Sequence, residues 1–185
     1  MILKIKSHFQ LSCVHETLAI TTRHGALVHS WLDYCNVLFA GLPACDIQRL
    51  QSVLNSAVRL VAGSSRRDHV TSLLRDRHWL PVKQRVEFKL CTMVHRCLYG
   101  DAPAYLVDLI VTSAAATGRA GLRSAASDAV AVPRTTSSFG DRSFAAAGPR
   151  ALNKLPPPLR HVHSATSFKR QLKTFLFNNT FNLRC

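Results

Sequence analysis

Acidic residues are scarce in this sequence of 185 residues: Asp and Glu number 10 against 24 Lys and Arg, and the formal net charge is +14. Most of the cations are Arg, whose planar guanidinium makes two-pronged contacts with phosphate, so the balance indicates an acidic partner. Two-metal phosphoryl transfer needs several carboxylates around ions about 4 Å apart. Here the acids are dispersed and no two are adjacent. We therefore expect no catalytic residue of this kind.

Long apolar runs are also missing. The longest stretch without Asp, Glu, Lys or Arg is 34–45, which includes Gly41 and Pro43, whereas a membrane span needs about 20 apolar residues. Lys4 and Lys6 interrupt the apolar start of the chain, which lacks the hydrophobic region of a secretory signal. These features predict an intracellular protein, cytoplasmic or nuclear, that is neither secreted nor held in a membrane.

Paired cysteines of the CxxC type are absent among the six cysteines. Two groups still hold several possible metal ligands: His161, His163 and Cys185, and Cys91, His95 and Cys97. Both lack the paired spacing of zinc sites, so we expect reduced thiols, mostly buried on helices, and surface imidazoles instead of a metal centre. The sequence contains no G-x-S-x-G motif and no P-loop. It predicts no cofactor and no small-molecule substrate.

Helical periodicity is clearest between residues 27 and 63. Apolar residues first recur at steps of three and four, namely Leu27, Val28, Trp31, Leu32 and Cys35. The turn-forming segment 41–43 then predicts a break. A second helix carries one apolar stripe, formed by Ile47, Leu50, Leu54, Ala57, Val58 and Val61, and Gly63 follows it. We expect this stripe, together with Trp79, to form the main core.

Shorter signals divide residues 64 to 111. Asp68 is placed to cap a short helix that carries Val70, Leu73 and Leu74, and segment 78–81 ends it. Pro81 suits the first turn of the next helix, which runs to Tyr99 and turns inward Val82, Val86, Leu90, Val94 and Cys97. Pro103 opens another short helix through Val111.

The composition changes at residue 112. Residues 112–128 are mostly Ala, Ser, Thr and Gly, which is typical of a flexible connector. Val130 and Val132 then alternate with alanines ahead of Pro133, a pattern that predicts a short strand at an edge.

Two helices are expected after the strand. One covers 142–147 and ends at Gly148-Pro149, with a further turn to Leu155. The last begins near 164–167 and has an inward stripe of Phe168, Leu172, Phe175 and Leu176. The patterns therefore predict a mainly α fold: a helical N-terminal part of about five helices, an Ala/Ser/Gly-rich connector, a short edge strand and a small basic helical C-terminal part. The corresponding ranges are 1–26, poorly defined; 27–111, helical; 112–128, connector; and 129–185, basic.

Positive charge is segregated toward the C-terminal end. No acidic residue follows Asp141, whereas a solvated helix face usually mixes both signs. Seven cations are candidate contacts to nucleic-acid phosphates: Arg142, Arg150, Lys154, Arg160, Lys169, Arg170 and Lys173. The alternative is a basic surface without a partner. On the last helix Lys169 and Lys173 share one side, with Arg170 between that side and the apolar stripe.

A second basic group lies near residue 70. It comprises Arg66, Arg67, Arg75 and Arg77, is partly offset by Asp68 and Asp76, and is more typical of a solvated turn. Trp79, beside His78, could stack on a base, although in a turn between helices it is more often a core anchor.

Several segments resemble one family, in the same order along the chain. They are LDYCN at 32–36, GLP at 41–43, DHV at 68–70, HWLPV at 78–82 followed by Gln84-Arg85, GDAPAYL at 100–106, VPRT at 132–135, FGDRSF at 139–144, NKLP at 153–156 and Phe168-Lys169. On these residues the chain from Leu27 to Phe177 is similar to the C-terminal part of reverse transcriptases encoded by non-LTR retrotransposons (LINEs) of the jockey and chicken-repeat type.

The resemblance implies a region that begins around the thumb, a helical element that tracks template and primer. In the family the palm, with its catalytic aspartates, precedes this region, so no catalytic residue carries over. The resemblance implies a non-catalytic C-terminal fragment of an RNA-directed DNA polymerase, with sequence-tolerant binding of RNA or DNA. The alternative is a small helical module, derived from a mobile element, that binds nucleic acid or protein.

Overall fold

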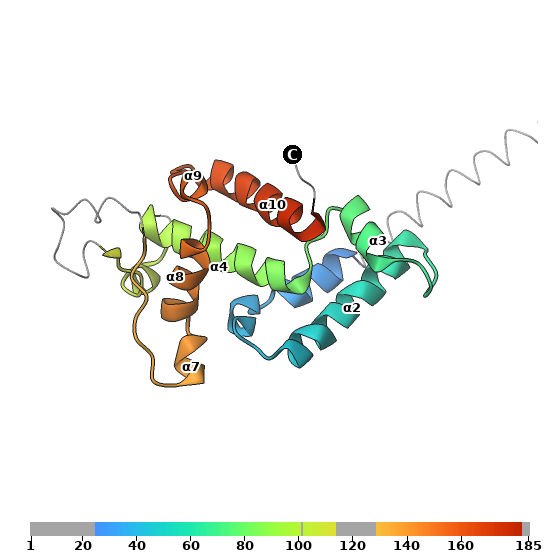
Figure 1. Cartoon of the computed structure of the whole chain (residues 1–185), viewed down its shortest axis with the longest axis horizontal. Helices are drawn as coiled ribbons and strands as arrows, with labels where there is room; N and C mark the ends of the chain where they lie inside the picture. Colours follow the sequence, from blue (N-terminus) through green and yellow to red (C-terminus); the bar gives the residue numbers. More distant parts are fainter. Residues whose placement is uncertain (1–24, 101, 114–128, 183–185) are drawn as a thin grey trace, which may run out of the picture.

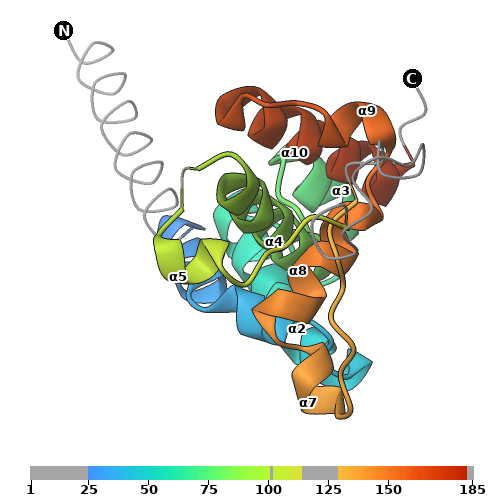
Figure 2. The ribbon, with the colours of Figure 1, turned by 90° about the vertical axis from the view of Figure 1, so that its left-hand side faces the viewer.

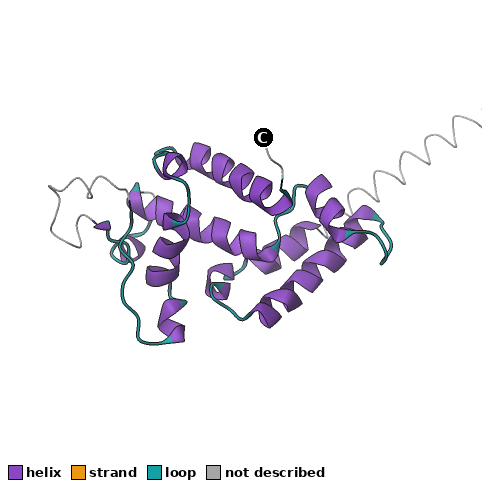
Figure 3. Ribbon diagram, viewed as in Figure 1, coloured by secondary structure: helices purple, strands orange, loops and turns teal. Residues whose placement is uncertain are grey.

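The computed structural model describes residues 25–100, 102–113 and 129–182. Within these ranges the chain is helical and forms no strand (Figures 1 and 3). A helical segment over 25–33 comes first. It is followed by the 3-10 helix η1 (Asn36–Phe39) and by α2 (Ala44–Ala62), α3 (Val70–Asp76), α4 (Val82–Leu98), α5 (Ala104–Val107), α7 (Ser138–Asp141), α8 (Phe144–Asn153), α9 (Pro157–Arg160) and α10 (Ala165–Phe181). The mainly α prediction is confirmed.

Helix α4 runs through the middle of the molecule and has other helices on several sides (Figures 1 and 2). Helices α2 and η1 pack on it, α10 runs along it and α8 crosses it. This position requires a helix that is apolar on more than one face, and its buried residues are Val82, Val86, Leu90, Cys91, Thr92, Val94, His95 and Cys97. The two polar side chains in that set donate hydrogen bonds to backbone carbonyls, Thr92 to Phe88 and His95 to Val162, each over 2.7 Å.

The crossing of α8 over α4 depends on a residue without a side chain. A Cβ on Gly148 would lie 2.6 Å from Cγ2 of Val94, closer than packed atoms come. The prediction that a helix would cover 142–147 and end at Gly148-Pro149 is wrong, because α8 begins at Phe144 and continues through Pro149. Both Gly148 and Pro149 are buried. Packing against α4 therefore outweighs the hydrogen bond that Pro149 cannot donate.

Most of the buried apolar side chains surround α4, α8 and α10. They include Leu80, Leu90, Val94, Ile110, Val130, Leu152, Leu155, Leu159, Phe168, Leu172 and Leu176. A smaller cluster comprises Leu32, Leu54, Val58, Leu74 and Val82, and Leu50 and Trp79 pack against it in a half-buried state.

The prediction that the α2 stripe forms the main core is therefore wrong. The stripe residues Leu54 and Val58 are fully buried, but they belong to the smaller cluster, and Ile47 belongs to neither cluster. Helical spacing identifies the inward face of α2 but not the number of helices that cover it. The opposite side of α2 stays open at Val53 and Leu60.

The segment over 25–33 turns a narrower apolar face inward than its spacing predicted. Leu32 is buried and Val28 packs against the smaller cluster. Leu27 and Trp31 are exposed, Trp31 to 76%. Cys35, the fifth position of the predicted stripe, is exposed in a left-handed conformation before η1. Only two of the five predicted positions therefore contact the core.

Two other boundaries differ from the sequence prediction. Helix α3 begins after His69 instead of Asp68. The Asp68 carboxylate accepts a hydrogen bond from the backbone N–H of Ser65 over 2.7 Å and so closes the turn after α2. Helix α5 ends at Val107, one turn before the predicted Val111.

A single bridge stands where an edge strand was expected. Thr112 and Val130 pair in antiparallel fashion, and the side-chain amide of Asn153 completes the pairing of Val130. Its Oδ1 accepts the Val130 N–H over 3.0 Å, and its Nδ2 donates to the Val130 carbonyl over 2.8 Å. Pro133 has no N–H with which to extend a ladder and Val132 is exposed, so the pairing stops there.

Residues 114–128 of the predicted connector 112–128 and nearly all of segment 1–26 lie outside the described residues. The parts on either side of the connector share one core, because α8 and α10 pack on α4. The boundaries of the four predicted ranges stay predictions.

Replacing Leu54 with alanine tests the packing of α2. Leu54 is 0% exposed, so its truncation leaves a cavity, and we expect the free energy of unfolding to fall by about 2–5 kcal/mol. Leu60→Ala, at a 64% exposed position on the same helix, is the matched control and should change it by less than about 0.5 kcal/mol. Denaturant titration measures both; equal effects would contradict the burial of Leu54.

Candidate nucleic-acid interface

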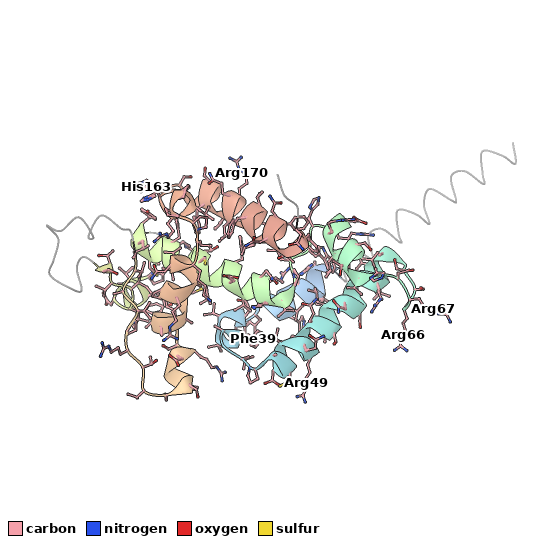
Figure 4. The ribbon with its side chains drawn as sticks, in the orientation of Figure 1. Phe39, Arg49, Arg66, Arg67, His163 and Arg170 are labelled. Atoms are coloured by element: carbon pink, nitrogen blue, oxygen red, sulfur yellow. The ribbon has the colours of Figure 1, made fainter. Side chains whose placement is uncertain are left out.

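The seven predicted cations do not form one surface. They lie on α8 or beside it, at the end of α9 and on α10. Arginines outside the predicted set extend the positive charge further: Figure 4 shows Arg66 and Arg67 at the turn after α2 and Arg49 on α2, at edges of the molecule away from Arg170. Positive charge is therefore spread over several edges.

Two of the cations near α8, Arg150 and Arg142, differ in what they contact. Arg150 pairs with Asp141, its Nη2 lying 2.6 Å from Oδ1, and Asp141 also accepts a hydrogen bond from the Thr135 hydroxyl. That hydroxyl and the guanidinium together hold the pKa of Asp141 below its usual range. Arg142 lies over the turn at Gly41, where a Cβ would come within 2.9 Å of its Cγ. Arg150 is therefore less available to a phosphate than the sequence predicted, whereas the Nε of Arg142 has no hydrogen-bond partner among the described residues.

Lys154 and Arg160 have different surroundings. Lys154 is exposed and lines a hollow of about 250 Å³ next to Asp141 and Glu87, so positive and negative charges mix there. Arg160, at the end of α9, is half-buried. Among the described residues its Nε has no hydrogen-bond partner.

The three cations of α10 face two sides. Arg170 borders a shallow groove with Pro156 and Phe175, and it points outward in Figure 4. Lys173 lines a cleft on the other side of the helix. Lys169 is exposed one turn before Lys173, so helical spacing places it on the side of Lys173 and not of Arg170.

The cleft beside Lys173 has a volume of about 520 Å³. It lies between the helical segment 25–33, the turn from α3 to α4, the first half of α4, and α10. We call it the basic cleft, and its charged and ring-bearing residues are His29, Asp33, Arg77, His78, Trp79, Arg85, Phe88, Lys89 and Lys173.

An ion pair lines the basic cleft. Arg85 on α4 binds Asp33 with both arms of its guanidinium, Nε to Oδ1 over 3.0 Å and Nη2 to Oδ2 over 2.5 Å. The Arg85 side chain is only 18% exposed. Two-pronged, partly buried pairs of this kind fix geometry more firmly than exposed pairs do. The pair joins the segment 25–33 to α4, and the Asp33 carboxylate neutralises the charge of Arg85.

Arg77 is also engaged, because its Nη2 donates a hydrogen bond to the carbonyl of Val61 over 3.1 Å. That carbonyl lies in the last turn of α2, where helix carbonyls lack partners within the helix. Lys89 and Lys173 differ: both are exposed, and no carboxylate among the described residues pairs with either. These two lysines carry the available positive charge of the basic cleft.

The turn from α3 to α4 holds a histidine in an unusual conformation. The N–H of Trp79 binds the Leu74 carbonyl over 2.8 Å, and the N–H of His78 binds the Arg75 carbonyl over 3.0 Å. These bonds form a Schellman motif, in which the left-handed position normally belongs to glycine. Here His78 occupies it, with φ 52°. A residue with a Cβ costs about 1–2 kcal/mol in that conformation.

Rings line the basic cleft on two sides. His29 meets Trp79 edge-on, with ring centroids 4.1 Å apart. His78 lies against Phe177 of α10 with centroids 5.3 Å apart and is itself exposed. Trp79 both packs against the smaller cluster and lines the cleft. Trp79 can therefore serve both as a core anchor and as a stacking surface for a base.

His29 is electrically neutral at physiological pH. Burial, followed by the nearby guanidinium of Arg85, lowers its pKa to about 4. The Lys173 charge acts in the same direction and the Asp33 carboxylate opposes it. His29 therefore contributes a ring and hydrogen-bonding atoms to the cleft, but no charge.

The cysteines are divided between core and surface. Cys91 and Cys97 are buried, and burial raises the pKa of both thiols, whereas Cys35 and Cys45 are exposed. His95 is buried and stacks on Phe168, so the expected surface imidazole is wrong at that position. Within residues 25–100, 102–113 and 129–182, no three His, Cys, Asp or Glu side chains converge on a metal position.

Sequence reasoning found one of the cations that line the basic cleft and missed the others. Of the seven predicted cations only Lys173 lines it. The sequence predicts a solvated turn for Arg77 and a helix for the segment that contains Arg85 and Lys89, and neither pattern marks these cations as binding residues. A usable signal did exist: the histidine where a helix end calls for glycine.

None of the helices in the described ranges combines the length and apolar character that crossing a bilayer requires. Comparison with protein-family models, curated proteins and solved structures finds no match to this chain.

The neutral state of His29 predicts a pH dependence of stability. Its pKa is about 4 in the fold and about 6.5 in the unfolded chain, so the unfolded chain takes up the proton first as pH falls. The contribution of neutral His29 to the free energy of unfolding is constant above about pH 6.5. This contribution is lost as the pH falls from about 6.5 to about 4. Denaturant titration should show this loss, and His29→Phe should reduce it because phenylalanine carries no proton.

His69→Gln, at an exposed position, is the matched control. It should keep the wild-type dependence, together with the carboxylate contributions common to all variants. A His29→Phe protein with the full wild-type loss of stability between pH 6.5 and 4 would contradict the neutral state of His29.

Proposed function

We propose that this chain is a helical nucleic-acid-binding module, tolerant of sequence and without polymerase chemistry of its own. It corresponds in this proposal to the thumb and post-thumb part of a non-LTR retrotransposon reverse transcriptase. Its ligand is RNA or DNA, held through phosphates and unpaired bases.

The observation that carries the proposal is the basic cleft. It combines two lysines without carboxylate partners, Lys89 and Lys173, with the rings of His78 and Trp79. Cations for the backbone and aromatic faces for the bases are the two elements of binding sites for single-stranded nucleic acid. The whole chain has a formal net charge of +14, which favours sequence-independent attraction to phosphates.

Segments on which the resemblance rests contact one another in the fold. Asp33, in segment 32–36, pairs with Arg85, which follows segment 78–82. Asn153, which begins segment 153–156, exchanges two hydrogen bonds with the backbone of Val130, two residues before segment 132–135. These contacts give several of the shared residues a structural role and so support the thumb-like assignment.

A second candidate function, protein binding, is favoured by an exposed apolar face. Leu27 and Trp31 are four residues apart on the helical segment 25–33, so they are neighbours on one side of it. Tyr34 lies in the turn that follows, and all three side chains are more than half exposed. Contiguous exposed apolar side chains are typical of protein contact surfaces. Trp31→Ser separates the candidates: it should leave nucleic-acid affinity unchanged if the basic cleft binds, and abolish partner binding if this face does.

Salt dependence tests the proposed function. Labelled oligonucleotides of unrelated sequence should bind with similar affinity, and log K should fall linearly with log salt, by about 0.9 per phosphate contact on duplex DNA or about 0.7 on single strands. Changing Lys169, Arg170 and Lys173 together to Gln should flatten the slope by up to about 2–3. The matched control is the triple variant Lys169→Arg, Arg170→Lys and Lys173→Arg, which preserves the charge at all three positions.

Fluorescence anisotropy gives affinities, and circular dichroism confirms that each variant keeps its helicity. Two results would argue against the proposal: no binding at low salt by the folded wild-type chain, or a slope that the glutamine variant leaves unchanged. The second result would remove α10, and with it Lys173 of the basic cleft, from the interface.

The proposal also predicts no primer extension. The acids of the sequence are dispersed, and no adjacent pair is available for two metal ions. Purified chain with a primed RNA template, nucleotides and Mg²⁺ or Mn²⁺ should yield no elongated product on a denaturing gel. Template-dependent extension that survives a mock purification would refute the non-catalytic assignment.

A further inference from the structure

We propose that the basic cleft holds one unpaired nucleotide of a single strand, with its base on the His78 ring and its phosphate at Lys173 and Lys89. The inference rests on the proposed function and specifies its ligand: single-stranded nucleic acid or a single-stranded end, in preference to a continuous duplex.

The dimensions of the cleft favour a nucleotide. Its volume of about 520 Å³ falls within the range of about 300–1,000 Å³ that small-molecule sites occupy. A duplex can lie only across the mouth of such a cleft, because its bases are paired and stacked. An unpaired base can enter and present its π-face to a protein ring.

The two lysines come from different helices and meet at the same cleft. Lys89 lies on α4 and Lys173 on α10. The other two cations of the cleft already have partners: Arg85 pairs with Asp33, and Arg77 donates a hydrogen bond to the Val61 carbonyl. A lysine ammonium is a mobile point charge on a flexible stem, suited to a phosphate whose position varies from one strand to another.

The backbone at His78 supplies an independent argument. The position is left-handed, and glycine would occupy it without the steric cost of a Cβ. Strained residues of this kind concentrate at binding sites, where the side chain has a use. The exposed ring of His78 borders the cleft beside Trp79. The competing explanation is that the ring only braces α10 through Phe177.

His78→Gly distinguishes these explanations, because the two effects have opposite signs. Relief of the left-handed strain should raise the melting temperature, while loss of the ring should weaken binding of a short oligouridylate by about 5- to 150-fold, the effect of one stacked base. Binding of a blunt-ended duplex with the same number of nucleotides should stay within about twofold at the same salt. If the ring instead only braces α10, the melting temperature falls and the two ligands change together.

Charge variants test the phosphate contact. Lys173→Gln should weaken oligouridylate binding more than duplex binding. Lys169→Gln, one turn away on the same helix and outside the cleft lining, is the matched control and should weaken both ligands alike. His78→Tyr, which restores a ring, should recover most of the oligouridylate affinity at a lower melting temperature than His78→Gly.

The outcomes separate this inference from the proposed function. A larger loss of oligouridylate binding than of duplex binding in both His78→Gly and Lys173→Gln supports the nucleotide site. Wild-type affinity for both ligands in a His78→Gly protein of raised melting temperature overturns the site and leaves nucleic-acid binding intact. Failure of the wild-type chain to bind either ligand overturns both. If His78→Gly does not fold, His78→Asn, which tolerates the left-handed conformation without a ring, takes its place.

Discussion

The close contact between α8 and α4 at Gly148 determines where the C-terminal third of the chain lies. Because Gly148 has no Cβ, α8 settles against Val94, and α9 and α10 continue from that fixed point. Helix α10 then covers α4 with Phe168 and Leu172, both 0% exposed. Its remaining turns carry Lys173 to the turn between α3 and α4. The basic cleft is thus completed by a helix whose position depends on a glycine outside the cleft.

Much of the fold follows from the sequence, and the failures share a cause. Helices α2, α4 and α10 appear where apolar spacing predicts them, because amphipathic periodicity is a local property of each helix. The identity of the main core depends on which helices meet, and spacing carries no such information. The same limit explains α8: Pro149 indicates a break in an isolated helix, whereas burial against α4 maintains the helix in the folded chain.

The candidate site was less predictable than the fold. Charge segregation predicts the C-terminal cations as phosphate contacts. In the fold, however, Arg150 is paired with Asp141 and Arg142 lies over the turn at Gly41. The basic cleft joins His29 near the start of the described chain to Lys173 near its end. No local pattern connects residues so far apart. Ion pairing, which decides which cations remain available, also becomes visible only when distant segments such as those of Asp33 and Arg85 meet.

Two neighbouring helix ends show how a local exception can indicate function. Gly63 ends α2 in a left-handed conformation, and a Cβ there would meet no atom within 4 Å, so conformation and not space explains the glycine. His78 adopts the same conformation after α3 at a cost of about 1–2 kcal/mol. That cost is a sizeable part of a typical stability of about 5–15 kcal/mol. Stability alone would favour glycine at both ends, and the difference between them lies in what surrounds them: open solvent beside Gly63, and the basic cleft beside His78.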